Sequence, residues 1–360
     1  MIRGTAATAT DPAAGEAARA ALAAGGSAAD AVIAGFLAAG GARPGVLLAP
    51  AVALVAGSGV GARAFDGRAA QPGRGAARPR GFVDVGSVPD AARVAVPRSL
   101  AMLSLLHGYV GRARLRDLAR AGVTAAERAG AEARAELLRH VGAAGVAALQ
   151  RRDVMRALVT VAGPVAGGTL TEQDLTDVLP ADADALVTEL DGGPSEEAGA
   201  ADLPVTGLRP PWPVGAEARP AEAIVACDGR GVLAALAYAP ADDGVPVPDL
   251  DLALGRDAVP VRRGVPRVAP GTLLPAAAPI AILLRGRFAA AVALEGLASL
   301  DNGTVTALAH RLVLERGWET TLPAQLGEAS EQAKARLARA VVRDGRDART
   351  LEVASSARLD

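Results

Sequence analysis

The chain has 360 residues, with 39 acidic and 38 basic side chains, so its formal net charge at pH 7 is −1. This balance argues against nucleic acid or an anionic membrane as a partner, because both attract an excess of basic residues. Hydrophobic residues make up 51% of the chain but aromatic residues only 2%, which predicts a core of small aliphatic side chains. Cys227 is the only cysteine, which excludes an intrachain disulfide and a cysteine zinc cluster.

Targeting segments and cofactor motifs are also missing from the sequence. No stretch predicts a membrane span, and the N-terminus lacks the basic start and apolar run of a secretory signal, so we expect a cytoplasmic protein. The glycine-rich run at residues 57–61 precedes a strand-like segment rather than a helix, which predicts a tight turn and not a phosphate loop. The histidines show no metal-ligand spacing, so we expect neither a metal nor a cofactor.

The first half of the chain predicts helices and strands in alternation, followed by a helical block. Asp11 before Pro12 is typical of a helix N-cap, and this helix should end near residue 24. Ser27 and Asp30 predict a capping box for a second helix that ends near residue 39. Apolar spacing predicts strands at residues 51–56, 62–66, 81–86 and 93–96, and helices over residues 97–152 and 172–179.

Residues 180–220 mark a change in composition. This segment is first acidic and then rich in proline and glycine, which predicts a linker or a long surface loop. It divides the chain into a first part at residues 1–179 and a second part at residues 221–360, which together are expected to form one compact domain.

The second part predicts two hairpins with helices packed on them. Continuously apolar strands are expected at residues 223–227, 232–237, 280–284 and 288–294, which indicates strands covered on both faces. Helices are expected over residues 304–316 and 328–343. The order of elements favours a layered α/β protein with a pair of sheets between helices.

Arg68 follows the strand at residues 62–66 and an Asp66-Gly67 turn. A guanidinium at the end of a sheet has the forked geometry that binds a carboxylate through two hydrogen bonds. The alternative, in a chain where Lys334 is the only lysine among 38 basic residues, is a solvated surface arginine.

Six short segments occur in order over most of the chain. They are residues 20–31, Phe65-Asp66-Gly67-Arg68 with Pro72, Val94-Ala95-Val96-Pro97 with the following helix, residues 115–130, Gly167-Gly168-Thr169-Leu170-Thr171-Glu172-Gln173-Asp174-Leu175, and the turn from Asp228 to Gly231. Together they resemble the motifs of the γ-glutamyltransferase (γ-glutamyltranspeptidase) family, which acts in glutathione metabolism. That family is longer, so the chain resembles a shortened member.

The resemblance implies an α/β (α+β) fold of the N-terminal-nucleophile hydrolase type, a four-layer αββα sandwich. In that family the precursor cleaves itself before a threonine, whose own α-amino group then serves as the base for attack on a γ-glutamyl amide. The threonine lies seven residues before the aspartate of the turn, which places its position at Ala221. Alanine has no hydroxyl group, so the sequence predicts no catalytic residue and excludes the family route.

The other implied site positions depart in the same direction. The family's residues around the substrate and the oxyanion fall on Ala239, Ala241, Pro275, Ala276, Gly296 and Leu297. Only Arg68 and Gly296 keep the family residue, so they are the predicted substrate-binding positions.

We therefore expect a degenerate γ-glutamyltransferase homologue that keeps the fold but has lost autoprocessing and γ-glutamyl transfer or hydrolysis. Its expected role is binding or regulation. Its expected partners are a small amino-acid or γ-glutamyl ligand and an active homologue, without nucleic acid or membrane. The alternative is a divergent hydrolase or transferase of γ-glutamyl or amino-acid amides with a relocated nucleophile, although no motif supports Thr206 or Cys227 in that role. A third possibility is a gene in decay with no retained activity.

Overall fold

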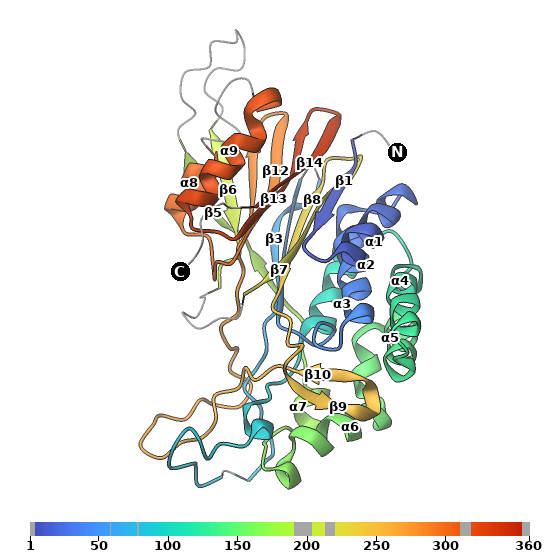
Figure 1. Cartoon of the computed structure of the whole chain (residues 1–360), viewed down its shortest axis with the longest axis vertical. Coiled ribbons are helices and arrows are strands. Elements are labelled where there is room, and N and C mark those ends of the chain that lie inside the picture. The colour runs from blue at the N-terminus through green and yellow to red at the C-terminus, as the bar shows by residue number, and fades with distance from the viewer. Residues whose placement is uncertain are drawn as a thin grey trace.

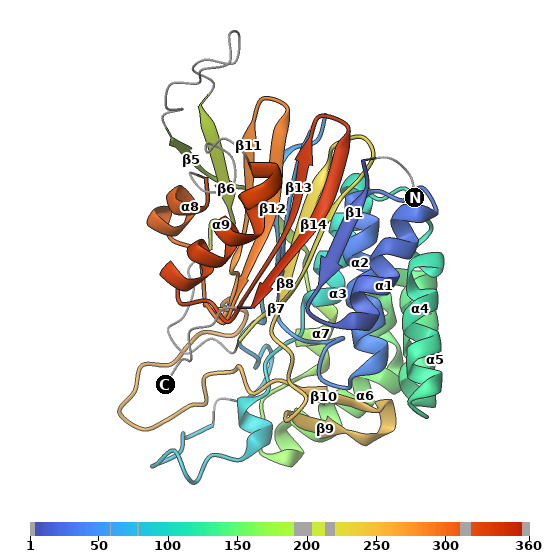
Figure 2. The same ribbon diagram turned by 45° about the horizontal axis from the view of Figure 1, so that its top comes forward.

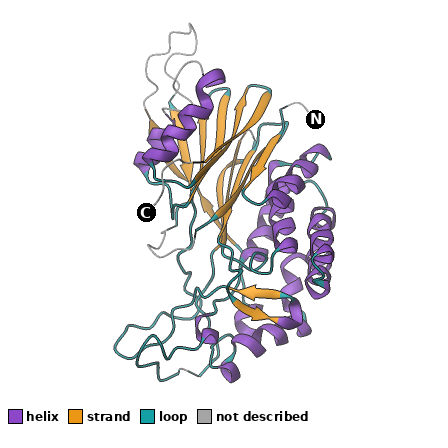
Figure 3. Ribbon diagram, viewed as in Figure 1, coloured by secondary structure: helices purple, strands orange, loops and turns teal. Residues whose placement is uncertain are grey.

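The computed structural model describes residues 4–57, 59–77, 79–190, 204–212, 220–309 and 318–354. Two six-stranded sheets lie face to face, and helices cover the outer face of each (Figures 1 and 3). All strand pairs within the two sheets are antiparallel. The four-layer αββα sandwich expected from the sequence is therefore confirmed. Within the described residues, no helix combines the length and the apolar character needed to cross a bilayer.

The larger helical layer begins with two capped helices. Asp11 accepts a hydrogen bond from the backbone N–H of Ala14 at the start of α1 (Pro12–Ala23). Ser27 and Asp30 form the predicted capping box of α2 (Ala28–Ala42), which packs against α1 and α4 and is buried along nearly its whole length. The other helices of this layer are α3 (Ser99–Val110), α4 (Leu115–Arg128), α5 (Glu132–Ala144), α6 (Arg152–Ala162) and α7 (Glu172–Thr176).

The sheet beneath these helices combines strands from both ends of the chain. Its order is β1 (Ala6–Ala9), β7 (Glu222–Cys227), β8 (Leu233–Tyr238), β2 (Ala51–Gly57), β3 (Gly61–Gly67) and β4 (Ala181–Asp184). The predicted hairpin of β7 and β8 is confirmed, and its turn closes because Asp228 accepts hydrogen bonds from the N–H groups of Arg230 and Val232. This turn lies at the end of β7 opposite Ala221.

The second sheet has the order β14 (Asp347–Ala354), β13 (Leu337–Asp344), β12 (Phe288–Glu295), β11 (Ile280–Arg285), β6 (Val205–Arg209) and β5 (Leu186–Leu190). Helices α8 (Asn302–Ala309) and α9 (Trp318–Gln332) cover its outer face. Figure 2 shows β14 beside β1, so the two terminal strands lie on the same side of the sandwich. A small hairpin of β9 (Val245–Val247) and β10 (Leu252–Leu254) packs near α6.

Alternating side chains on the central strands fill three separate layers of core. On β8, Ala234 and Leu236 face the large helical layer, whereas Ala235 and Ala237 face the second sheet. Strand β12 repeats this arrangement, with alternate residues directed at the first sheet and at α8 and α9. The layer between the sheets consists largely of alanine, as the composition predicts.

Several predicted elements differ from the structure. Residues 180–220 are not only a loop, because they contribute β4, β5 and β6, and their polar character reflects strands at or near sheet edges with one face towards solvent. The expected helix at 328–343 is wrong, because α9 ends at Gln332 and β13 pairs with β12. Residues 81–86 and 93–96 form no extended strand. Residues 310–316 of the helix expected at 304–316 lie outside the described residues.

Candidate functional site

A pocket of about 470 Å³ lies at the head of β7, where the resemblance places the nucleophile. Its lining brings together residues from β7, from the loop after β8, from the end of β12 and from the segment before β13. They are Pro220, Ala221, Glu222, Pro240, Asp243, Glu295, Gly296 and Arg336. Two predicted positions, Ala221 and Gly296, therefore share one pocket, and Arg68 is not among its lining residues.

Gly296 has a backbone conformation that glycine adopts more readily than other residues. Its φ angle is +91°, and a β-carbon at this position would come within 2.8 Å of the Cγ atom of Arg336. Glycine here ends β12 and lets the Arg336 side chain lie directly over the backbone. Leu297 and Pro275 do not fill the pocket, since Leu297 packs towards the core under α8 and α9 and Pro275 is exposed.

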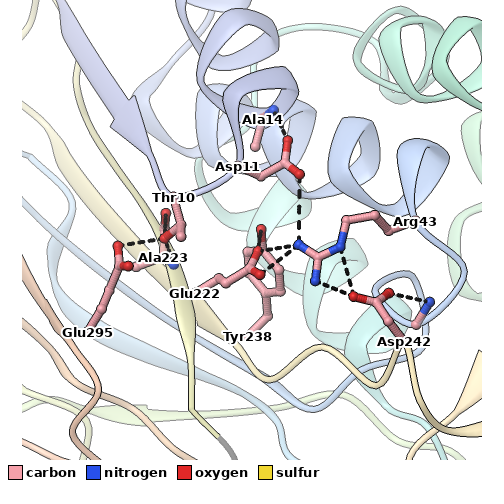
Figure 4. A network of polar contacts seen from close by, with 10 residues as sticks. Thr10, Asp11, Ala14, Arg43, Glu222, Ala223, Tyr238, Asp242 and Glu295 are labelled. Atoms are coloured by element: carbon pink, nitrogen blue, oxygen red, sulfur yellow. Dashed lines mark hydrogen bonds and ion pairs between the residues drawn. The ribbon is translucent and has the colours of Figure 1, made fainter. Parts of the chain in front are cut away.

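The carboxylate of Glu222, next to Ala221, is held by two side chains. Arg43 donates from Nη1 to both carboxylate oxygens at 2.6 and 2.8 Å, and the buried Tyr238 donates its hydroxyl at 2.9 Å. Arg43 also binds Asp242 and lies 3.8 Å from Asp11, as Figure 4 shows. Burial and the neighbouring Glu222 raise the pKa of Tyr238, so this phenol stays protonated as a donor.

A second carboxylate in the lining, Glu295, has its own partners. Thr10 donates its hydroxyl to Oε1 at 2.5 Å and Arg339 donates from Nε at 2.9 Å. Burial raises the pKa of Glu295 despite these two hydrogen bonds, which act in the opposite direction. Thr10 also accepts the N–H of Ala223 at 2.8 Å, so the same hydroxyl links β1 to β7 (Figure 4).

Two charged side chains of the pocket remain available. Both Asp243 and Arg336 are exposed, and neither side chain forms an ion pair or hydrogen bond with another described residue. Among the described residues, Asp243 and Arg336 thus lack a direct partner, whereas the charges of Glu222 and Glu295 are compensated by Arg43 and Arg339.

The described lining of the pocket contains no hydroxyl or thiol side chain. Ala221 presents only a methyl group, and none of the described lining residues is serine, threonine or cysteine. Cys227 lies at the far end of β7, fully buried, where burial raises the pKa of its thiol to about 12 and keeps it protonated. Thr206 lies on β6 in the other sheet.

The forked side chain of Arg68 is already bound to a carboxylate of the chain itself. It donates from Nε and Nη2 to the two oxygens of Asp66 at 3.1 and 2.9 Å, and its backbone N–H also donates to Asp66. The ring of Trp212 covers the guanidinium at 5.4 Å, and Arg98 lies 3.6 Å from the same carboxylate. The predicted geometry of Arg68 is thus present, but an internal aspartate occupies it.

Sequence reasoning missed Thr10, Arg43, Glu222, Glu295 and Arg339 as parts of this site. The signal that could have found two of them is a glutamate at the end of an otherwise apolar strand, as at Glu222 and Glu295. A charged group in such a place needs a partner, since burial of an unpaired charge is costly.

No protein-family model matches the sequence, and no curated protein matches it either. Solved structures do match over the whole chain. Two structures of LmbA2991 cover 99% of this chain and 97% of their own, with TM-scores of 0.72 and 0.69 and sequence identities of 15% and 14%. A cephalosporin acylase from Bacillus halodurans covers 99% of this chain and 94% of its own, with a TM-score of 0.68 and 12% identity.

A γ-glutamyltranspeptidase from Pseudomonas nitroreducens also matches, over 51% of this chain and 68% of its own, with a TM-score of 0.43 and 16% identity. At these identities the full-length matches establish the fold alone. The chain thus has the N-terminal-nucleophile hydrolase fold of LmbA2991 and the cephalosporin acylase, and the resemblance expected from its sequence is confirmed at the level of fold.

Proposed function

We propose that this chain is a ligand-binding protein on an acylase fold, without self-cleavage and without γ-glutamyl transfer or hydrolysis. The observation that carries the proposal is the methyl group of Ala221 at the head of β7, in a pocket whose described lining has no hydroxyl or thiol. An N-terminal-nucleophile mechanism needs that hydroxyl and a freed α-amino group beside it. The cytoplasmic location stays a prediction from the sequence.

The charges of the pocket support an amino-acid or γ-glutamyl ligand. Arg336 and Asp243 have no direct side-chain partner in the described part of the chain, so a zwitterion could place its carboxylate at Arg336 and its ammonium group at Asp243. Arg68 enters the proposal as a structural residue, because its fork is engaged by Asp66. An active homologue as protein partner remains part of the proposal.

Intact-mass spectrometry of the purified chain tests the loss of processing. We expect one uncleaved species at 35.9 kDa and no turnover of a γ-glutamyl anilide. Ala221→Thr should remain uncleaved, because other positions implied by the resemblance, including Ala239 and Ala276, are also changed. Ala221→Val is the control for Ala221→Thr, because valine has nearly the same volume as threonine but no hydroxyl group. Cleavage of the wild type before Ala221, or anilide hydrolysis, would refute the proposal.

Thermal unfolding with added glutamate tests the binding role. Glutamate should raise the melting temperature of the wild type and of Lys334→Gln, an exposed site outside the pocket, but not that of Arg336→Gln. A glutamate effect that survives in Arg336→Gln and disappears in Arg68→Met would instead place the carboxylate at Arg68. No effect in the wild type would favour a chain that has lost the ligand as well as the chemistry.

One observation favours the relocated-nucleophile alternative enough to test it. The hydroxyl of Thr10 lies 2.5 Å from Glu295, a carboxylate of the pocket whose pKa burial raises. A carboxylate in this position can accept the proton of an attacking hydroxyl. Ester or amide hydrolysis that is lost in both Thr10→Val and Glu295→Gln would establish that role. Unchanged background rates in both variants would leave Thr10 as a link between β1 and β7.

A further inference from the structure

A second pocket, of about 410 Å³, lies between two long loops outside the sandwich. One loop follows Arg68 and the other follows β10, and they run side by side at the lower left of Figure 1. Backbone hydrogen bonds join them, from Phe82 to Val261 and from Arg263 to Phe82. The pocket shares no lining residue with the pocket beside Ala221 and lies within the size range of small-molecule sites.

The charged side chains that line this second pocket are basic. Two arginines, Arg74 and Arg267, line it, and none of its described lining residues is acidic. The nearby carboxylate of Asp174 is not among the lining residues, and it accepts the backbone N–H groups of Gly73 and Arg74 and caps α7. Asp177 lies 3.4 Å from Arg74 and partly offsets its charge, whereas no described carboxylate pairs with Arg267, so the lining carries net positive charge.

Hydrogen-bonding capacity also remains in the pocket. Arg74 uses Nη1 for Asp177 at 3.4 Å, and Arg267 uses Nη2 for the carbonyl of Pro79 at 3.3 Å, while their other guanidinium N–H groups bind no described residue. The hydroxyl of Thr169 likewise has no partner among the described residues. Gly271 permits this placement of Arg74, since a β-carbon there would come within 2.6 Å of Nη2.

Apart from Gln71, whose amide group is hydrogen-bonded to the backbone of Val259, the remaining described lining is apolar. Val261, Val268, Ala269 and Pro270 lie on the second loop, and Pro72 lies on the first. A ligand that only carried charge would leave these surfaces in contact with water. An anionic head group with a short apolar body would use both parts of the lining.

We propose that this pocket, which we call the loop pocket, binds a small organic anion. Arg74, Arg267 and Thr169 hold its carboxylate or phosphate group, and the apolar residues of the second loop contact its body. This site is independent of the proposed function of the Ala221 pocket, so either can fail without the other.

Isothermal titration of the full chain with hexanoate, hexyl phosphate and inorganic phosphate tests the loop pocket. Hexanoate or hexyl phosphate should bind, and whichever binds more tightly identifies the head group. Arg267→Gln and Thr169→Val should each weaken binding, Arg267→Gln by at least about tenfold, as expected for a lost charge-assisted contact. Arg263→Gln is the matched control, since Arg263 lies exposed on the same loop and outside the lining.

Three results would overturn the loop pocket. One is the absence of binding of every probe by the wild type up to about 10 mM, a range that detects even weak sites. Another is an equal loss in Arg267→Gln and Arg263→Gln, which would show general charge attraction. The third is binding that is lost in Arg336→Gln and kept in Arg267→Gln, which would place the anion beside Ala221. Inorganic phosphate that binds as tightly as hexyl phosphate would refute the contact with an apolar body.

Discussion

The buried pair of Arg68 and Asp66 should contribute strongly to stability. Arg68→Met keeps the apolar stem but removes the partner of a carboxylate that is 1% exposed. Removing one member of a buried pair typically costs about 3–5 kcal/mol, because the other charge stays buried and unpaired. Arg98 lies 3.6 Å from Asp66 and the backbone N–H of Arg68 still donates, so we expect the lower end, about 3 kcal/mol. Asp66→Asn should cost more, since it leaves both arginines without a counter-charge.

Urea unfolding followed by circular dichroism measures both effects, and the double variant measures the coupling. Arg68→Met with Asp66→Asn should lose up to about 3 kcal/mol less than the sum of the single variants. Arg63→Met is the matched control, because Arg63 lies on β3 with Asp66 and pairs with Asp182 and Asp184 at the surface, where ion pairs contribute little. If Arg68→Met were no more destabilising than Arg63→Met, the fork would not be committed to Asp66, and Arg68 would again be the candidate for ligand binding.

Three further predictions concern the core, the thiol and a helix cap. Ala235→Leu, between the sheets, should destabilise the fold by about 1–3 kcal/mol through overpacking, measured by urea unfolding, and a neutral effect would mean that the layer has spare room. Cys227 should resist alkylation at pH 8 until the chain unfolds. Its proton is held more tightly in the folded state, so its contribution to stability is full below about pH 8.5 and declines as the pH rises towards 12. Ser27→Ala should cost about 1 kcal/mol in a urea titration, and Asp30→Ala more, because its carboxylate also accepts the N–H groups of Arg112 and Ala113. Equal costs would contradict that second role.

Local chemistry made the early helices and the central hairpins predictable from the sequence. Asp11 and Ser27 act on N–H groups only three residues away, so their effect is visible in a short window of sequence. The strands of the two hairpins are continuously apolar because both faces are covered, and each pair is separated by a glycine-containing turn.

The hairpin of β13 and β14 was not predicted, because its formation depends on β12, a strand distant in the sequence. Residues 337–344 are rich in alanine and arginine, which favour a helix when considered alone. Pairing with β12 overrides that preference, and Arg339 becomes acceptable in a strand because Glu295 neutralises it. Tertiary contacts of this kind leave no periodic signal in the strand itself.

The candidate site was also only partly predictable, because its charge network depends on tertiary contacts. Ala221 and Gly296, the positions that the motifs indicated, line one pocket, and their role there stays a prediction. The charge network around that pocket joins Arg43 to Glu222 and Asp242 across nearly 200 residues of chain. No spacing in the sequence predicts contacts between residues so far apart. The pairing of Arg68 with Asp66 was not predictable either, because it depends on the direction of the Arg68 side chain.

The alanine layer between the sheets has a consequence for how this gene can change. A single nucleotide substitution in an alanine codon yields valine, threonine, serine, proline, glycine, aspartate or glutamate. Apart from glycine and serine, each adds bulk, charge or rigidity where methyl groups of opposing strands already meet. In most proteins core mutations destabilise the fold by creating cavities, whereas here the accessible mutations destabilise it by adding volume. Natural variants at positions such as Ala235 and Ala291 should therefore be confined to glycine and serine. Sequences of the gene from natural populations would show whether other residues occur at these positions.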